Sequence, residues 1–328
     1  MFRITDLLVP AIFLGLGFSA PYLADWLIAT STVALSAGLV VLGLIIMWRG
    51  GLVSFGQGLY FALGAYTTAL ILRLTPINDA IVLMVASAAM AGLVAFAVGF
   101  LIARYREIFF AMLTLALSMI LYGVLVKTEA LGSTDGFNVE QWSLFGTDVV
   151  VEKRLTIAFY LALASASVAS VVAMMYLRSV AGSAAIPLRE NEIRVEYLGA
   201  SVKNIIHAKV TIAGAMAGLG GCLTALAIGH VDPQMAFWTQ SGEFVFITIL
   251  AGAFSVPGAF VAAFLFQLMR TYALQVFPEG WQLILGGMLL AVILFMPSGI
   301  GILLTKAGWR RRPATTPGAT AEAAEARS

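Results

Sequence analysis

Charged side chains are scarce in this sequence. Asp, Glu, Lys and Arg make up 11% of its 328 residues, whereas 61% of the residues are hydrophobic. A soluble domain usually carries about 25% charged residues, so too few are present here to cover a surface that faces water. The shortage of charge therefore excludes an ordinary soluble domain and indicates that lipid surrounds most of the exterior.

Residues for catalysis, metal binding and cross-linking are equally few. The one cysteine, Cys222, lies in an apolar stretch and has no partner for an intrachain disulfide, so it is interpreted as a small packing residue. Two histidines without a His-Glu-x-x-His motif exclude a histidine-rich metal site. The sequence contains no Gly-x-x-x-x-Gly-Lys-Ser/Thr phosphate loop, and no Ser-His-Asp set can be nominated. We therefore expect a chain that is not an enzyme and holds no cofactor of its own.

Long apolar runs dominate what is present. Runs of about 20 residues span a bilayer as helices, whereas membrane barrels show about 10 residues of strict alternation per strand. Backbone polar groups in lipid must be paired internally, so the sequence predicts an all-α fold, a polytopic transmembrane helical bundle. Ten segments are expected, at approximately residues 7–24, 27–48, 52–72, 80–103, 108–127, 155–177, 207–229, 243–254, 257–277 and 282–304.

The eighth segment is shorter than the others. It ends in the sequence Phe254-Ser255-Val256-Pro257-Gly258, and proline and glycine at such a point break a helix. The eighth and ninth segments therefore form either a true hairpin or a partly re-entrant element. No cleavable signal peptide is evident, so the first segment is expected to be a retained helix.

Lys and Arg are distributed unevenly over the two sides of such a bundle. If all ten segments cross and both termini are cytoplasmic, 14 of the 19 Lys and Arg residues lie on the cytoplasmic side. Cytoplasmic loops of membrane proteins are enriched in these residues. We therefore expect one transmembrane domain, residues 1–308, with an outer loop at 128–154, a cytoplasmic loop at 178–206 and a basic, then disordered tail at 309–328.

Small residues recur at helical spacing in the third segment. Gly56, Tyr60, Gly64 and Thr68 follow one another every four residues, and Gln57 lies one position round from them. This spacing lets helices approach closely, while polar groups at membrane depth should face protein or water. Two interpretations stay open: helix packing with internal hydrogen bonds, or a solute path lined by polar side chains.

The seventh segment shows the same spacing. Gly214 and Gly218 are four residues apart, as are Ala217 and Gly221. The pattern predicts a close-packing face, with a sliding surface for conformational change as the alternative.

Lone ionisable residues within apolar segments are functional candidates, because charge is expensive at membrane depth. Glu243 begins the eighth segment and Arg270 lies inside the ninth. Glu243 could instead mark the membrane interface, and Arg270 could extend toward it. The candidate residues of a solute path are Ser54, Gln57, Tyr66, Thr67, Thr114, Ser118, Glu243 and Arg270.

The cytoplasmic loop contains a charged stretch, residues 183–199, that reads as one short amphipathic helix. Pro187 suits a first helical turn and Gly199 a C-terminal stop. Glu190 precedes Arg194 by four residues, the favourable order for an ion pair. Such a helix is either solvated or docks on a partner, and its mixture of apolar and charged groups favours docking.

Four stretches resemble one known family, the membrane permease subunits of ATP-binding-cassette importers for branched-chain amino acids, of the LivM type. The first ends in Gly-Ala-Tyr-Thr, the second is similar to Tyr-x-Ala-Met-x-Thr-Leu-Ala, the third is a glycine-rich outer turn, and the fourth reads Arg-Glu-Asn followed by Glu-x-Leu-Gly. They occur in the family's order and together cover nearly the whole chain. In this sequence they are residues 54–70, 109–116, 132–137 and 189–199.

The resemblance implies partners that the chain itself does not supply. It implies a second permease subunit of the LivH type, two cytoplasmic ATPase subunits that bind ATP and Mg, and an extracytoplasmic solute-binding protein, in a bacterial inner membrane. Residues 131–138 would face the binding protein. The cytoplasmic loop would form the coupling helix in a groove of an ATPase, through Arg189, Glu190, Asn191, Glu192, Arg194 and Glu196.

The sequence also departs from the family. The family usually has His where this chain has Gln57, and its glycine-rich stretch differs from residues 251–259 here. The resemblance implies a branched-chain or other small amino acid as the solute, moved by alternating access, with urea or a short amide as the alternative. An ion-coupled carrier would need an ion site of paired carboxylates or unwound helix ends. An intramembrane enzyme would need clustered acid, base or metal-binding side chains.

Overall fold

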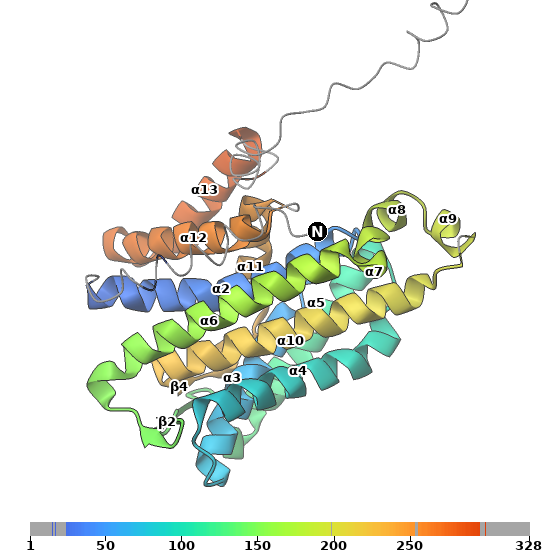
Figure 1. Ribbon diagram of the computed structural model, residues 1–328. Helices are drawn as coiled ribbons and strands as arrows, with labels where there is room; N and C mark the ends of the chain where they lie inside the picture. Colours follow the sequence, from blue (N-terminus) through green and yellow to red (C-terminus); the bar gives the residue numbers. More distant parts are fainter. Residues whose placement is uncertain are drawn as a thin grey trace, which may run out of the picture.

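The computed structural model describes residues 24–295 apart from 198, 253 and 254, together with residues 15, 17 and 299. Helices dominate this part of the chain, which confirms the predicted all-α fold (Figure 1). The first predicted segment, 7–24, lies almost wholly outside the described residues, and the tail at 309–328 lies wholly outside them. The long helices are α2 (Asp25–Trp48), α3 (Gln57–Leu74), α4 (Ala80–Ile102), α5 (Glu107–Lys127), α6 (Val151–Arg178), α10 (Val202–Ile228), α11 (Trp238–Ala251), α12 (Val256–Val276) and α13 (Trp281–Phe295).

Short elements form the connections. Three short helices follow α6 and make up most of the cytoplasmic loop: α7 (Val180–Ser183), α8 (Ala185–Glu190) and α9 (Glu192–Tyr197). Two 3-10 helices and four two-residue strands complete the described part: η2 (Glu129–Leu131), η3 (Pro233–Ala236), β1 (Phe137–Asn138), β2 (Ser143–Leu144), β3 (Thr147–Asp148) and β4 (His230–Val231).

Among the described residues, six helices are long and apolar enough to cross a membrane, namely α2, α4, α5, α6, α10 and α12. The other predicted segments on described residues also form helices, but shorter ones. Helix α3 has 18 residues and starts at Gln57 rather than at residue 52, and α11 has 14 residues. At 1.5 Å per residue, α11 is about 21 Å long, against about 30 Å of hydrocarbon. Helix α11 is therefore too short to cross the hydrocarbon by itself, which fits the re-entrant alternative for the eighth and ninth segments taken together.

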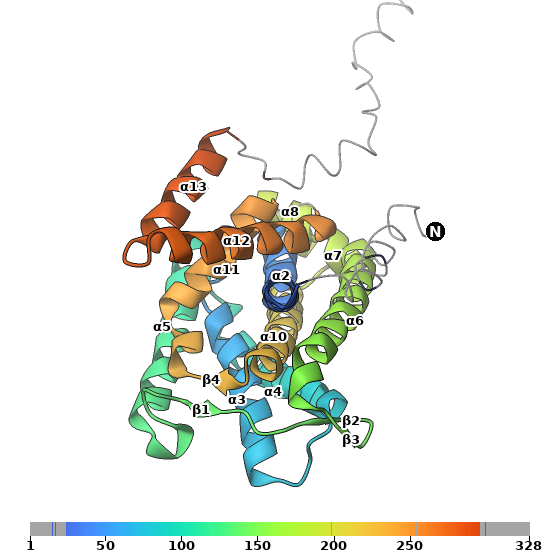
Figure 2. The ribbon, with the colours of Figure 1, turned by 90° about the vertical axis from the view of Figure 1, so that its left-hand side faces the viewer.

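Helix α10 lies at the centre of the bundle and packs against α2, α3 and α4 (Figure 2). A Cβ added to Gly218 would lie 2.8 Å from the carbonyl oxygen of Ser87 in α4, and one added to Gly220 would lie 2.6 Å from that of Ser36 in α2. On the α3 side, a Cβ added to Gly64 would lie 2.6 Å from the Cα of Gly218. Backbones approach this closely only where a side chain is missing, so the predicted close-packing faces are confirmed.

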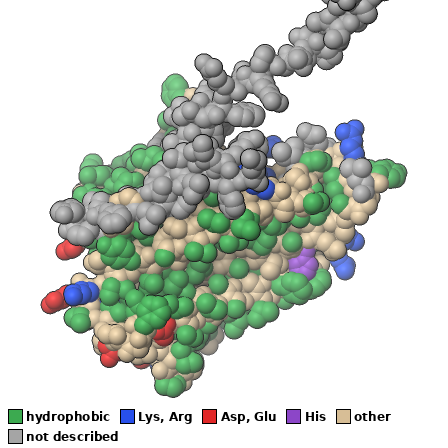
Figure 3. Space-filling model, in the orientation of Figure 1, with side chains coloured by type: hydrophobic (Ala, Val, Ile, Leu, Met, Phe, Trp, Pro, Cys, Tyr) green, Lys and Arg blue, Asp and Glu red, His purple; other side chains and the backbone are tan. Residues whose placement is uncertain are grey.

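The connections gather at two ends of the bundle. At one end β1 pairs antiparallel with β4, and Asp79 bridges to Ser143. At the other end Arg106, just before α5, forms an ion pair with Glu192 of α9. These groups are the ones that the sequence assigned to the outer and cytoplasmic sides, so we call the two ends outer and cytoplasmic. On the face in Figure 3, charged side chains lie mainly toward the two ends, and the belt between them is largely uncharged.

Candidate functional site

Helix α3 begins inside the bundle rather than at its cytoplasmic end. A Cβ added to Gly56 would lie 2.9 Å from the carbonyl oxygen of Thr114 in α5, and one added to Gly58 would lie 3.4 Å from Oγ of Ser118. Ser118 lies about 16 Å along the axis of α5 from its start at Glu107. That distance is about half of a 30 Å hydrocarbon core, so α3 starts near mid-depth.

The segment that follows β4 reaches the same depth from the outer end. Oγ of Ser118 donates a 2.8 Å hydrogen bond to the carbonyl oxygen of Ala236 in η3, and the Gly58 N–H donates one of 2.9 Å to Oγ of Ser241 in α11. Figure 2 views α2 and α10 end-on but α11 from the side, so α11 runs across the long helices. The structure therefore favours the re-entrant alternative for the eighth segment.

Polar side chains gather where α3, α5 and α11 meet, and all of them are at most 3% exposed. Four of the five were predicted from the sequence. The fifth, Ser241 on α11, was missed because the predicted segment began at Glu243. The polar residues Thr239 and Gln240, just before Ser241, could have indicated it. We call the five the mid-depth cluster: Ser54, Gln57, Thr114, Ser118 and Ser241.

Hydroxyl groups of the cluster bond to backbone N–H groups at and just before the start of α3. The Phe55 N–H donates to Oγ1 of Thr114 at 3.2 Å, and the Gly56 N–H donates to Oγ of Ser54 at 3.2 Å. Ser241 accepts from the Gly58 amide, as described above. A helix start leaves such donors without helical partners, and no water replaces them in lipid. The hydroxyls thus make a helix start possible at this depth.

Gln57 is the exception in the cluster, because its side chain is poorly bonded. Nε2 lies 3.4 Å from Sδ of Met47, a weak acceptor, and Oε1 has no hydrogen-bond partner among the described residues. The residue is 0% exposed. Buried polar groups are normally satisfied, so this carboxamide retains capacity to bind a ligand.

Helix α12 also begins near mid-depth. A Cβ added to Gly38, in the middle of α2, would lie 2.9 Å from Cε1 of Phe260 in the first turns of α12. Oγ of Ser255 accepts a 3.1 Å hydrogen bond from the Gly258 N–H and caps this helix. Three helices, α3, α11 and α12, therefore start at similar depth. Of the three, α3 and α11 start together at the mid-depth cluster, whereas α12 starts just beyond the far end of α11. Helix N-termini carry partial positive charge, so the shared start of α3 and α11 favours an anionic group.

Tyr66 and Thr67 lie farther along α3, toward the outer end, and the structure does not bring them into the mid-depth cluster. The Tyr66 ring meets the edge of Phe137 with 5.8 Å between centroids, and its hydroxyl has no partner among the described residues. Thr67 is half-buried, whereas its neighbour Thr68 bonds to Ser87 of α4 at 2.8 Å. Thr68 is thus a packing residue between α3 and α4.

Glu243 and Arg270 are paired rather than alone, so the prediction of lone intramembrane charges is wrong. Nη1 of Arg270 donates to Oε2 of Glu243 at 3.0 Å, and the side chains are 31% and 15% exposed respectively. The Arg270 guanidinium also lies 5.1 Å from the ring centroid of Trp281. A contact between residues 27 positions apart cannot be read from apolar periodicity. The pair links α11, α12 and α13 instead of joining the mid-depth cluster.

The cytoplasmic segment consists of two short helices, α8 and α9, and the prediction of one continuous helix is wrong. The chain breaks at Asn191, which has φ −161° and ψ 103°. Oδ1 of Asn191 accepts a 3.1 Å hydrogen bond from the Arg194 N–H, and so caps α9. The break removes the helical spacing that would align Glu190 with Arg194. Gly199 ends the segment with φ +83°, as predicted.

Most of the predicted coupling residues lie on the surface of this segment. Arg189, Asn191, Arg194 and Glu196 are exposed, whereas Leu188 and Val195 are 2% and 3% exposed and pack inward. The segment thus has an apolar side fixed to the bundle and a charged side turned outward. Glu190 lies in α8.

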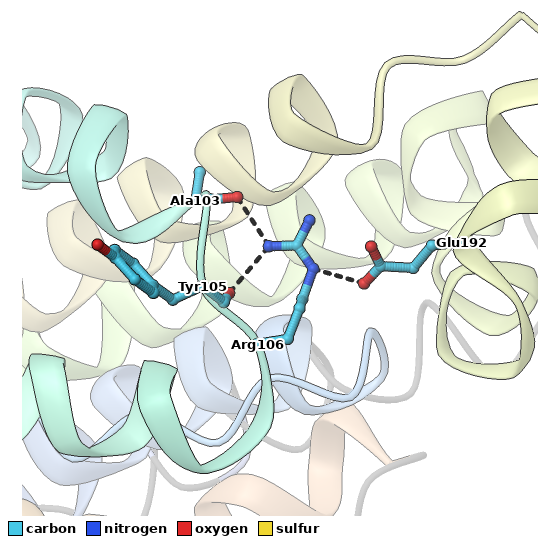
Figure 4. Close-up of polar contacts among 4 residues, drawn as sticks. All are labelled: Ala103, Tyr105, Arg106 and Glu192. Atoms are coloured by element: carbon cyan, nitrogen blue, oxygen red, sulfur yellow. Dashed lines mark hydrogen bonds and ion pairs between the residues drawn. The ribbon is translucent and has the colours of Figure 1, made fainter.

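Glu192 differs from the other coupling residues because it is paired within the chain. Figure 4 shows its carboxylate against Nε of Arg106, which precedes α5. Nη1 of the same guanidinium donates to the carbonyl oxygens of Ala103 at 2.7 Å and Tyr105 at 2.9 Å. This ties α9 to the connection between α4 and α5. At the C-terminal end of α2, the Arg49 guanidinium is half-buried, and this burial lowers its pKa from the ordinary value.

Comparisons with known proteins agree with this architecture. The chain is 29% identical over 286 residues to the high-affinity branched-chain amino acid transport system permease protein LivM of Escherichia coli, which covers 80% of this chain and 67% of the relative. The LivM protein of Salmonella typhimurium is also 29% identical, over 290 residues, with the same coverage. BraD of Pseudomonas aeruginosa, a permease protein of the same kind of system, is 28% identical over 124 residues, 38% of this chain and 40% of the relative. No solved structure is a significant match.

The family model described as "branched-chain amino acid transport system / permease component" matches residues 26–293. That range includes the mid-depth cluster, the cytoplasmic segment and nearly the whole of all six helices that are able to span a membrane. The resemblance read from the sequence is therefore confirmed. The chain is a multi-pass membrane protein that belongs to the family of permease components of branched-chain amino acid transport systems.

Proposed function

We propose that this chain is the permease subunit of an importer that moves a small amino acid by alternating access, driven by ATP hydrolysis on partner subunits. The mid-depth cluster carries this proposal. It places a buried, poorly bonded carboxamide beside helix starts halfway through a bundle of the permease family. Discontinuous helices at the bilayer midplane are a common way for transporters to hold a solute.

A branched-chain or other small amino acid suits this region better than urea or a short amide. The solute carboxylate would meet the positive ends of α3 and α11, and Oε1 of Gln57 offers an acceptor for its ammonium group. An apolar side chain would meet Phe61 and Phe244, whose rings lie 5.2 Å apart beside the cluster. Urea carries no net charge and would gain less from the helix dipoles than a carboxylate does.

The energy source is proposed to lie on other chains. The exposed side of the cytoplasmic segment offers Arg189, Arg194 and Glu196, together with Ile193 at 63% and Tyr197 at 88% exposure. Large apolar groups beside charges are typical of a protein contact rather than of a solvated loop. We propose that one of two cytoplasmic ATPase subunits, which hold ATP and Mg, binds at this surface.

The remaining partners are proposed from membership of the permease family. A solute-binding protein would dock at the outer end, on the loop at 128–154, and a second permease subunit would complete the path. We propose that residues 7–24 form a further crossing, so that both termini are cytoplasmic, and that the membrane is a bacterial inner membrane. Residues 1–308 would then form one domain.

Reconstitution of the copurified complex tests the proposal. We expect ATP-dependent uptake of leucine that excess urea does not inhibit. Gln57→Leu should lower uptake by about 10-fold or more, the size of effect expected when a buried polar contact to the solute is lost, whereas Thr67→Val, outside the cluster, should not. Glu192→Lys and Arg194→Glu should abolish uptake while the binding protein still binds leucine. Uptake by this chain alone, driven by an ion gradient, would support an ion-coupled carrier and contradict the proposal.

A further inference from the structure

The turn between α2 and α3, residues 48–52, lies directly under the cytoplasmic segment. Gly51 has φ +77°, and a Cβ added to it would lie 3.4 Å from Cγ of Arg189. A Cβ added to Gly50 would lie 3.6 Å from Cδ2 of Leu188, a residue that is only 2% exposed. Helix α8 therefore rests on this turn through two successive residues.

The same turn rests on Lys209 of the central helix α10. Lys209 is 0% exposed, and its Nζ has no hydrogen-bond partner among the described residues. A Cβ added to Gly50 would collide with this Nζ, so glycine is the residue that leaves it room. The ammonium group lies at the C-terminal end of α2, where helix carbonyls present partial negative charge and the Arg49 guanidinium presents a like charge. A buried ammonium without a carboxylate is otherwise unfavourable at this depth, and simple packing would be served better by an apolar side chain.

The turn also connects to the mid-depth cluster, through Met47. The carbonyl oxygen of Met47 accepts from the Gly50 N–H at 2.9 Å and from the Leu52 N–H at 3.3 Å, and its Sδ lies 3.4 Å from Nε2 of Gln57. Met47, Leu52 and Leu188 belong to one buried hydrophobic cluster. A continuous series of contacts thus runs from α8 through the turn to the carboxamide in the mid-depth cluster.

We propose that Lys209 is a positioning residue, which holds the α2–α3 turn against α10 so that a displacement of α8 is transmitted to Met47 and Gln57. Without Lys209 the turn would shift when α8 moves, and the displacement of α8 would not be transmitted to the mid-depth cluster. The inference rests on the proposed function, because the displacement is that caused by partner ATPases. The displacement is thus transmitted through the turn at residues 48–52 and the buried ammonium of Lys209.

The test measures ATP hydrolysis and leucine uptake in the same proteoliposomes, using the full complex. Lys209→Met keeps most of the side-chain length and removes the charge. We expect uptake to fall about 10-fold, within the range of typical coupling between sites, while ATP hydrolysis stays within about twofold of wild type. Lys203→Met, an exposed lysine on the same helix, is the matched control and should change neither rate. Parallel loss of uptake and hydrolysis, or loss of neither, would overturn the proposal.

A second set of variants tests the contact itself. Gly50→Ala should also reduce uptake more than hydrolysis, because its methyl group displaces the ammonium. In a Lys209→Ala background the methyl group finds room, so the double variant should be no worse than Lys209→Ala alone. Gly123→Ala, whose Cβ would meet nothing within 4 Å, controls for the change of residue type. If the losses of uptake caused by Gly50→Ala and Lys209→Ala add in the double variant, the proposed contact between Gly50 and Lys209 is contradicted. A wild-type complex without ATP-dependent uptake would contradict the proposed function as well.

Discussion

A methyl group added to Gly64 tests the packing on which the candidate site depends. In Gly64→Ala the new Cβ would lie 2.6 Å from the Cα of Gly218, whereas carbon atoms in contact are about 3.5–4.0 Å apart. The backbones of α3 and α10 would have to separate by about 1 Å, because the opposing atom belongs to no side chain that can rotate away. Overpacking typically costs about 1–3 kcal/mol. We expect the upper end of that range, since helical hydrogen bonds hold both backbones.

The assay is thermal unfolding of the purified protein in detergent, followed by loss of the monodisperse peak. A loss of about 3 kcal/mol should lower Tm by roughly 6–12 °C. Gly123→Ala is the matched control, because its Cβ would meet nothing within 4 Å and alanine favours a helix by up to about 1 kcal/mol. Equal melting temperatures for the two variants would refute the argument that the backbones of α3 and α10 are in contact.

Three further predictions concern polar groups outside the mid-depth cluster. Tyr66→Phe should leave Tm unchanged or raise it slightly, because the hydroxyl is buried without a described partner; a clear drop in Tm would show that it is satisfied. Arg270→Met should destabilise the protein by about 2 kcal/mol, because Glu243 is left without its partner. Adding Glu243→Gln should recover much of the lost stability. If no stability is recovered, the two residues are not paired. Arg106→Glu should reduce uptake but cost less than about 1 kcal/mol of stability, because the Arg106–Glu192 pair is partly exposed. The charge-swapped double variant with Glu192→Arg should restore uptake. Failure to restore it would assign Glu192 to a partner contact.

Apolar run length was sufficient to predict most of the helices, because in lipid the backbone must be helical wherever it is continuous. It could not predict the depth at which a helix begins. Residues 52–55 include Leu52, Val53 and Phe55, so the sequence predicted a helix from residue 52, but hydroxyls of Ser54 and Thr114 accept from backbone N–H groups there and replace the helical bonds. Competition of this kind depends on a side chain from another helix, which a single segment does not reveal.

The cytoplasmic segment shows the opposite case, in which a local signal was present but outweighed. Asn191 is a strong N-cap residue, and its side chain does cap α9 in the structure. The prediction of one helix relied on the spacing of Glu190 and Arg194, and an ion pair at that spacing stabilises an isolated helix by only about 0.2–0.5 kcal/mol. An N-cap hydrogen bond contributes about 1 kcal/mol. The cap at Asn191 therefore outweighs the ion pair and decides the local structure.

The mid-depth cluster is stable only as a unit, and this bears on how the bundle would open. Each hydroxyl that leaves an amide near the start of α3 exposes an unsatisfied donor where no water replaces it, at about 1–3 kcal/mol per group. Helices α3, α5 and α11 are therefore expected to stay together while the site is empty. On the proposed function, the carboxylate of a solute would accept from the same amides and so replace the hydroxyls that now bond to them. The solute would then stabilise the separated arrangement more than the closed one, which is the differential binding that any ligand-driven change of conformation requires.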